Sequence, residues 1–209
     1  MTTFHIKLLA AVLMFCDHIG VIFFPDVLAF RFLGRLSFPL FAWLIGQGEK
    51  HTSNFNIYLV RLGILGLLSQ PIYYLLFTSF NLNILATLFL GLLAIRLDKF
   101  TNIKLLSPLC FSVLAQLLNA EYGAYGVFTI TVLSEINFYS IAWWMKWTLL
   151  NLITLFLPGF SFYQVLAVMA PIILILWNGK QGRRAKWLYA FYPLHLALII
   201  IVRLLILGS

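Results

Sequence analysis

The chain has 209 residues, of which 63% are hydrophobic and only 10% are charged. Ordinary soluble domains are about 45–50% apolar and about 25% charged, so this composition excludes a fold that has water as its main solvent. The formal net charge is +8, but the 14 basic residues are spread between apolar runs instead of gathering on one soluble face. That distribution argues against a nucleic-acid partner.

Long apolar runs, separated by short polar breaks, predict an all-α polytopic transmembrane helical bundle that forms a single domain over residues 1–209. A transmembrane β-barrel would need apolar residues at every second position, and runs such as 85–94 do not alternate in this way. About nine helices are predicted, over residues 5–24, 30–47, 56–77, 83–97, 104–119, 123–136, 139–157, 160–177 and 187–207.

Lysine and arginine lie at every second break between these helices. Basic residues concentrate in the cytoplasmic loops of membrane proteins, so the sequence predicts an inside N-terminus and an outside C-terminus. Such cations also attract the anionic headgroups of membrane lipid. The inner positions are Lys7, Lys50, Arg96, Lys99, Lys104, Lys180, Arg183, Arg184 and Lys186.

Arg31 and Arg35 break this charge rule, because they follow the first predicted outer break. Residues four apart share one face of a helix, so both side chains are expected on the same side of the second helix. An alternative for Arg31 is an interfacial anchor whose head reaches the lipid headgroups. Arg35 lies deeper and is the better candidate for a functional residue.

Asp17, His18 and His195 are ionisable residues inside apolar runs. An ionised side chain at the centre of a membrane helix costs roughly 2.5–3.5 kcal/mol, so each must face protein or water. At 1.5 Å per residue, His18 lies about 20 Å along the first helix and His195 about 12 Å along the last. Pro193 marks a kink beside a polar cavity, and the two histidines are expected to line it.

Imidazole accepts and returns protons near neutral pH, and a neighbouring carboxylate can fix its tautomer. The sequence therefore predicts His18 as a general base oriented by Asp17. One alternative is that the histidines only form hydrogen bonds between helices. Another is a metal held by both histidines and a carboxylate, but the spacing does not call for it and no metal site is predicted.

Two breaks and one aromatic cluster carry further candidates. Glu121 lies in an outer turn with Gly123 and Gly126, where it either contacts substrate or is a solvated loop carboxylate. The basic stretch 178–184 binds either a phosphorylated cofactor or inner-leaflet lipid. The indole rings of Trp143, Trp144 and Trp147 surround Lys146 and predict an interfacial anchor.

Several short motifs follow one another along nearly the whole chain. They are Asp17-His18-Ile19-Gly20, Gly34-Arg35-Leu36-Ser37-Phe38-Pro39-Leu40-Phe41, Tyr58-x-x-Arg61-Leu62, Asn83-Ile84-Leu85-x-Thr87, Glu121-Tyr122-Gly123-x-x-Gly126, Asn178-Gly179-Lys180-x-Gly182 and Phe191-Tyr192-Pro193-Leu194-His195. In this order they resemble the TraX family of membrane proteins, which is implicated in pilin N-acetylation. The spacing of Lys7 and His18 is similar to that in the membrane acyltransferases that decorate surface polysaccharides.

The resemblance implies a multi-pass protein of the bacterial inner membrane. It also implies that acetyl-CoA or another acyl-CoA is the co-substrate, and that His18 matches the histidine held to be catalytic in the polysaccharide enzymes. Arg35 and His195 match motif positions of the family. The chain departs from the family pattern at Gln47, where an acidic residue is expected, at Glu121, which replaces Asp, and at Trp177, which replaces Tyr.

These observations together predict a membrane acyltransferase with four catalytic residues, His18, Asp17, Arg35 and His195, among which Arg35 steadies developing negative charge. The predicted acceptor is a peptide amine or a sugar hydroxyl in a peptide or glycan. Lys180, Arg183, Arg184 and Arg61 are expected to bind the coenzyme, and Glu121 and Tyr192 the acceptor. The sequence does not set the oligomeric state.

Two other classes of function use the same polar residues. In a proton-coupled transporter, the intramembrane Asp and His residues would relay protons, and broken helices would occur at matching places in two halves of the chain. In an assembly partner of a membrane complex, they would only form hydrogen bonds between helices.

Overall fold

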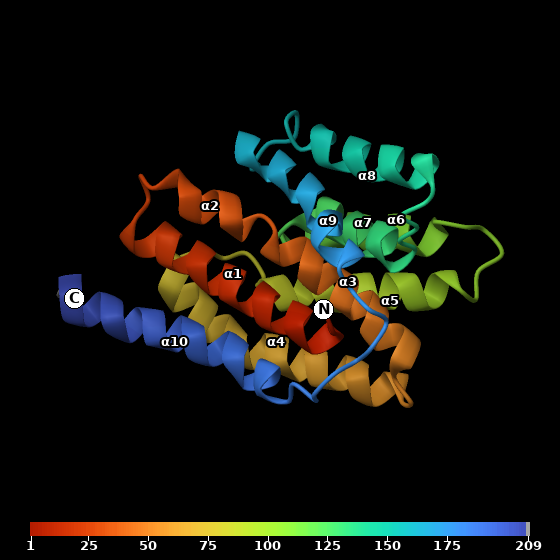
Figure 1. Cartoon of the computed structure of the whole chain (residues 1–209). Coiled ribbons are helices and arrows are strands. Elements are labelled where there is room, and N and C mark those ends of the chain that lie inside the picture. The colour runs from red at the N-terminus through yellow and green to blue at the C-terminus, as the bar shows by residue number, and fades with distance from the viewer. Residues whose placement is uncertain (208–209) are drawn as a thin grey trace. The chain divides into compact units, whose positions relative to one another are not determined.

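The computed structural model describes residues 1–207, and their secondary structure is helical (Figure 1). Within this range ten α-helices and one 3₁₀ helix follow one another. This confirms the predicted all-α class. The helices are α1 (Thr3–Phe23), α2 (Leu28–Gly34), α3 (Ser37–His51), α4 (Phe55–Phe77), α5 (Ile84–Asp98), α6 (Leu106–Leu117), α7 (Gly123–Ser134), α8 (Ile141–Ile153), η1 (Phe162–Met169), α9 (Ala170–Ile175) and α10 (Trp187–Leu207).

All nine predicted segments are helical, but two of them are interrupted. The second divides into α2 and α3, because α2 ends at Gly34 and the chain turns before Ser37. The eighth divides into η1 and α9. Pro171 lies in the first turn of α9, where its missing N–H costs no intrahelical hydrogen bond.

Four helical segments in residues 1–207 are long and apolar enough to cross a membrane: Thr3–Phe23, Leu28–His51, Phe55–Phe77 and Trp187–Ile206. The second of these combines α2 and α3. The 12 residues of α6 or α7 make only about 18 Å of helix, against a hydrocarbon core about 30 Å thick. The predicted helical segments are thus confirmed. Within residues 1–207, these four are the ones long enough to cross the whole membrane. The inside–outside orientation stays a prediction.

The chain forms two compact units. The first combines Met1–Phe41 with Trp147–Ser209, and the second is Ala42–Lys146. Helices α3 and α8 each begin in one unit and end in the other. The prediction of a single domain over the whole chain stays a prediction.

In the first unit, α1 packs against both α2 and α10. Figure 1 shows that α1 and α10 lie side by side and run in the same direction. The close approach of α2 depends on Gly20, where an added Cβ would lie 2.3 Å from the Cβ of Phe30.

The first turn of α1 is hydrogen-bonded to the basic stretch 178–184. The Thr3 amide donates to the Lys180 carbonyl at 2.9 Å, and the Phe4 amide donates to the Gln181 carbonyl at 3.1 Å. Trp177 adds a bond from its indole N–H to the Thr3 hydroxyl at 3.1 Å. These contacts fix the basic stretch at the N-terminal end of α1.

The second unit is built from α4 to α7 and parts of α3 and α8. The core between α5, α6 and α7 is formed by small and branched side chains, Leu90, Ala94, Ala115, Ala120 and Val127. Gly91 allows Ile130 to approach α5, because an added Cβ at Gly91 would lie 2.2 Å from the Ile130 side chain. Glu49, whose side chain is 2% exposed, pairs with Arg96 and Lys99.

Candidate functional site

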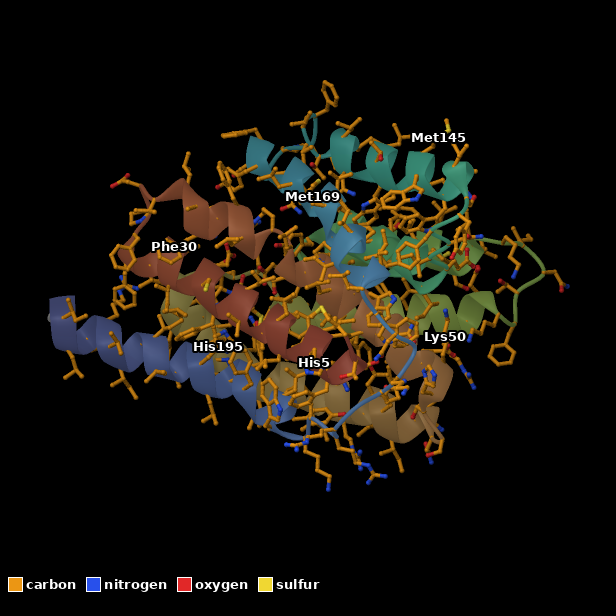
Figure 2. The ribbon with its side chains drawn as sticks, in the orientation of Figure 1. His5, Phe30, Lys50, Met145, Met169 and His195 are labelled. Atoms are coloured by element: carbon orange, nitrogen blue, oxygen red, sulfur yellow. The ribbon has the colours of Figure 1, made fainter. Side chains whose placement is uncertain are left out.

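A pair of histidines joins α1 and α10. Nδ1 of His18 lies 2.9 Å from Nε2 of His195, although the two residues are 177 positions apart in the chain. Figure 2 shows His195 on the side of α10 that faces α1. The structure thus brings together the two histidines that the sequence predicts in one cavity.

The hydrogen bonds of this pair define where its protons lie. Nδ1 of His195 is 2.8 Å from the carbonyl oxygen of Phe191. A carbonyl only accepts, so in neutral His195 Nδ1 carries the hydrogen and Nε2 carries the lone pair. His18 must then donate from its own Nδ1 to that lone pair, which leaves the lone pair of His18 on Nε2. This is the ring nitrogen of His18 that is able to accept a proton.

Aromatic side chains enclose His195. Its ring stacks on Phe191, with centroids 4.6 Å apart, and meets the edges of Phe15 and Tyr192 at 6.3 and 5.6 Å. His195 and Tyr192 are both 4% exposed. Rings on one turn of α10 and one turn of α1 therefore hold the imidazole in place and keep its surroundings apolar.

A second polar cluster lies on α1 and α2, around the carboxylate of Asp17. Arg31 Nη1 donates to Oδ1 of Asp17 at 2.8 Å. Arg35 Nη2 donates to both carboxylate oxygens, at 3.1 and 2.8 Å. The prediction that both arginines share a face is confirmed. Arg31 also ion-pairs within the protein, with a side chain only 20% exposed, which differs from the interfacial-anchor alternative.

The cluster holds two cations and one carboxylate, so it has an excess of one positive charge. Tyr163 of η1 lies under both guanidinium groups, with its ring centroid 5.6 Å from the central carbon of Arg31 and 5.8 Å from that of Arg35. Arg35 Nη1 also donates to Oε1 of Gln164 at 3.0 Å. The ring quadrupole and the amide oxygen partly offset the excess charge.

Gly34 makes room for this ion cluster. An added Cβ there would lie 2.1 Å from Oδ1 of Asp17 and 2.4 Å from its Cβ. We therefore expect Gly34→Ala to push α2 away from α1 and to lower the free energy of unfolding by about 1–3 kcal/mol, as overpacking does. Thermal unfolding of the purified protein measures the effect. Gly66→Ala is the control, because its added Cβ would lie at an ordinary 3.4 Å from Leu85, and equal losses in both variants would contradict the prediction.

The contacts change the role predicted for Asp17. Its carboxylate is held by Arg31 and Arg35, and the orienting hydrogen bond on Nδ1 of His18 comes from His195. The reason is geometric. Neighbouring side chains on a helix point about 100° apart, so Asp17 faces α2 while His18 faces α10.

The predicted coenzyme-binding residues fall in both units. Lys180, Arg183 and Arg184 are exposed in the basic stretch of the first unit. His18 lies 15 positions after Thr3, or about 22 Å along α1 from the point where that stretch is anchored. Arg61 is exposed on α4 of the second unit, and its predicted role in coenzyme binding stays a prediction.

Glu121 also belongs to the second unit, where it closes a turn before α7. Its amide donates to the Leu82 carbonyl at 2.9 Å, and its own carbonyl accepts from the Thr87 hydroxyl. These contacts join the start of α5 to the turn before α7, which gives the motifs at 83–87 and 121–126 a structural role. The predicted contact of Glu121 with the acceptor stays a prediction.

Sequence reasoning missed Tyr163, Gln164 and the Phe191 carbonyl. A signal existed only for Gln164, a polar residue inside an apolar run. The indole rings of Trp143 and Trp147 differ from the predicted interfacial anchor. Both are buried, and their N–H groups donate to the carbonyls of Val132 and Val168. In residues 1–207 no group of three or more His, Cys, Asp and Glu side chains is placed to hold a metal ion.

Comparison with known proteins places this site in a family. The family model described as TraX protein matches residues 3–203. A curated relative, the probable fimbrial assembly protein FimC (serogroup H1) of Dichelobacter nodosus, is 29% identical over 95% of this chain and 94% of its own length. An uncharacterized protein of Rickettsia prowazekii (strain Madrid E) is 32% identical over 41% of this chain and 33% of its own length.

No solved structure matches the chain. The family match covers both histidines and the arginine cluster, and the apolar helices fit a membrane protein. The resemblance of the sequence motifs is therefore confirmed, and the chain belongs to the TraX family.

Proposed function

We propose that this protein is an acyltransferase of the bacterial inner membrane, which moves an acyl group from a coenzyme A thioester to an amine or hydroxyl acceptor. The observation that carries the proposal is the hydrogen-bonded chain from the Phe191 carbonyl through His195 to His18. It directs the lone pair of His18 to Nε2, on a ring held in one orientation. A general base needs such a fixed, correctly tautomerised imidazole.

His18 takes the proton from the acceptor nitrogen or oxygen as that atom attacks the thioester carbonyl. The new positive charge on the His18 ring strengthens its Nδ1–H bond to His195. The excess positive charge of Arg31 and Arg35 over Asp17 favours the negative charge that develops on the carbonyl oxygen. Arg35 is the better candidate for this role. It is only 9% exposed, and a buried charge is less screened by water than an exposed one.

The basic stretch 178–184 suits the phosphates of the coenzyme. Lys180, Arg183 and Arg184 are exposed there, and Lys180 is held by its backbone bond to Thr3. Cations that lie close together in sequence on a turn attract phosphate groups. With an inside N-terminus, this stretch meets the cytoplasm, where the coenzyme is supplied.

The proposal is tested with purified protein, radiolabelled acyl-CoA and a candidate acceptor peptide. His18→Ala is expected to lower turnover by about 10²–10⁴-fold, the usual contribution of a general base. His51→Ala is the matched control, because this exposed imidazole is hydrogen-bonded to the Gln47 carbonyl of its own helix and lies in the second unit. Equal turnover by the wild type and His18→Ala would remove His18 from the mechanism.

A second candidate function is supported by the printed name of the Dichelobacter relative, a probable fimbrial assembly protein. In that case the chain acts as an assembly partner in a membrane complex, with or without a catalytic step. The candidate acceptor for the enzyme would then be a fimbrial subunit. Cells that carry His18→Ala separate the two functions, because a purely structural partner would still support fimbriae.

A further inference from the structure

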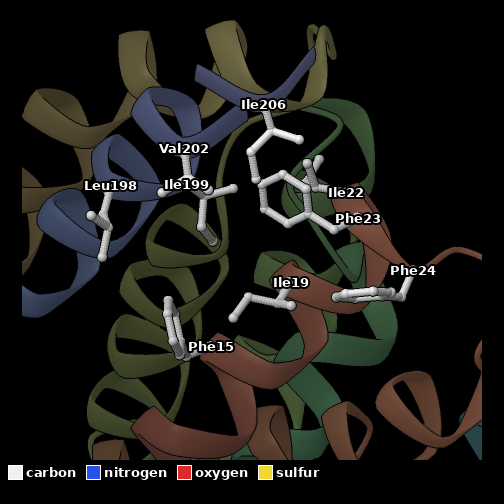
Figure 3. Close-up of a pocket in the computed structure, with 9 residues that line it drawn as sticks. All are labelled: Phe15, Ile19, Ile22, Phe23, Phe24, Leu198, Ile199, Val202 and Ile206. Atoms are coloured by element: carbon white, nitrogen blue, oxygen red, sulfur yellow. The ribbon is translucent and has the colours of Figure 1, made fainter. Parts of the chain in front are cut away.

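A pocket of about 440 Å³ lies between the C-terminal halves of α1 and α10 (Figure 3). Its lining is apolar throughout, and includes Phe15, Ile19 and Phe23 from α1 and Leu198, Ile199 and Val202 from α10. Both helices belong to the same unit and both are long and apolar enough to span a membrane. The pocket therefore lies within the hydrocarbon depth of the predicted bundle.

One lining residue of the pocket, Phe15, is in contact with the histidine pair. Phe15 meets the ring of His195 edge-on at 6.3 Å, and Ile22 lies four positions after His18 on the same face of α1. On α10, Leu198, Ile199 and Val202 stand three, four and seven positions after His195, on the same helix face. The pocket lining thus continues from the two imidazoles for about 12 Å along the parallel helices.

An apolar pocket of this volume is in the range of small-molecule sites. Its lining offers no polar side chain for a headgroup, a peptide or a sugar. A hydrocarbon chain matches this apolar lining. An acyl chain that enters at the histidine end would have its carbonyl group near His18 and His195. The polar end of such a ligand would meet His18, and the methyl end would lie toward Val202 and Ile206.

We propose that this pocket binds the hydrocarbon chain of the transferred acyl group, so that the protein uses fatty acyl donors well beyond acetyl in length. This inference rests on the proposed function and names its donor class. In the step, the acceptor nitrogen or oxygen forms a bond to the acyl carbonyl carbon and the carbon–sulfur bond breaks. The thiolate that leaves takes up the proton that His18 removed from the acceptor.

The test uses the full-length protein in phospholipid nanodiscs and acyl-CoA donors from acetyl to palmitoyl. The wild type is expected to prefer palmitoyl to acetyl donors by at least about tenfold in kcat/KM, a difference of about 1.4 kcal/mol. Val202→Trp fills the pocket and is expected to lower palmitoyl transfer until that preference is lost. Leu205→Trp is the matched control, because Leu205 is 80% exposed and does not line the pocket.

A second measurement does not depend on turnover. A palmitoyl-CoA analogue with a photoreactive diazirine at its methyl end should label α1 and α10 at the pocket, and Val202→Trp should reduce labelling about tenfold while Leu205→Trp should not. Equal labelling in both variants overturns the inference. So does equal labelling by a phospholipid that carries the same diazirine, because the pocket is then filled by bulk lipid.

The outcomes for the two proposals are distinct. Transfer of acetyl alone by the wild type, with no pocket labelling, overturns the chain-length inference and leaves the proposed acyltransferase standing. Absence of turnover with every donor contradicts the proposed function, and the labelling pattern then decides the pocket by itself.

Discussion

His195→Ala is expected to slow acyl transfer by about 10²-fold, even though His195 does not take the proton in the proposed step. The substitution removes the lone pair that accepts from Nδ1 of His18. The His18 ring then loses the contact that sets its tautomer, so its lone pair is no longer held on Nε2. Steady-state kinetics with labelled acyl-CoA measure the loss.

A conservative variant separates positioning from simple damage. His195→Gln supplies a side-chain oxygen that accepts the same hydrogen bond, so it should recover at least about tenfold of the rate lost in His195→Ala. Substrate KM should change little in either variant, because His195 is enclosed by Phe15, Phe191 and Tyr192. If the Gln and Ala variants are equally slow, the orienting role is wrong.

Asp17→Asn is expected to have the largest effect on stability. It leaves Arg31 and Arg35 side by side without a counter-charge, on side chains only 20% and 11% exposed. Removing one partner of a buried ion pair costs about 3–5 kcal/mol, and the partial exposure here places the expected loss near about 3 kcal/mol in the free energy of unfolding. Thermal unfolding in detergent provides the measurement.

A double-mutant cycle checks the cause of this loss. Arg35→Gln removes one of the two cations, so the double variant should be less damaged than the sum of the two single variants by at least about 1 kcal/mol. Asp26→Asn, an exposed position in the turn between α1 and α2, should change stability little. Strict additivity of Asp17→Asn and Arg35→Gln would contradict the ion cluster.

The positions of the helices could be predicted because apolar runs and their breaks are local features. Each of the nine predicted segments coincides with a helix or a helix pair. Helix lengths were overestimated at several ends, and Gly34 and Pro171 divide two segments. An apolar run alone does not show whether its residues continue as one helix or change direction inside the protein.

The pairing of polar side chains could be predicted only in part. Two buried histidines in apolar runs pointed to one cavity, but their bond depends on the rotation of α1 relative to α10, which no local pattern sets. For the same reason the sequence alone pairs Asp17 with its neighbour His18, whereas the structure pairs it with Arg31 and Arg35. The buried indoles of Trp143 and Trp147 show the same limit, because tryptophan is typical of both interfaces and cores.

The first unit is built from two stretches of the chain that the ribosome makes at different times. His18 emerges from the ribosome 177 residues before His195, which is about 10–35 s at 5–20 residues per second. During that interval α1 is already inserted, and its histidine lacks the acceptor that α10 later supplies. A chain arrested before α10 therefore lacks the hydrogen bond that joins His18 to His195, and its candidate site is incomplete until the last helix is made.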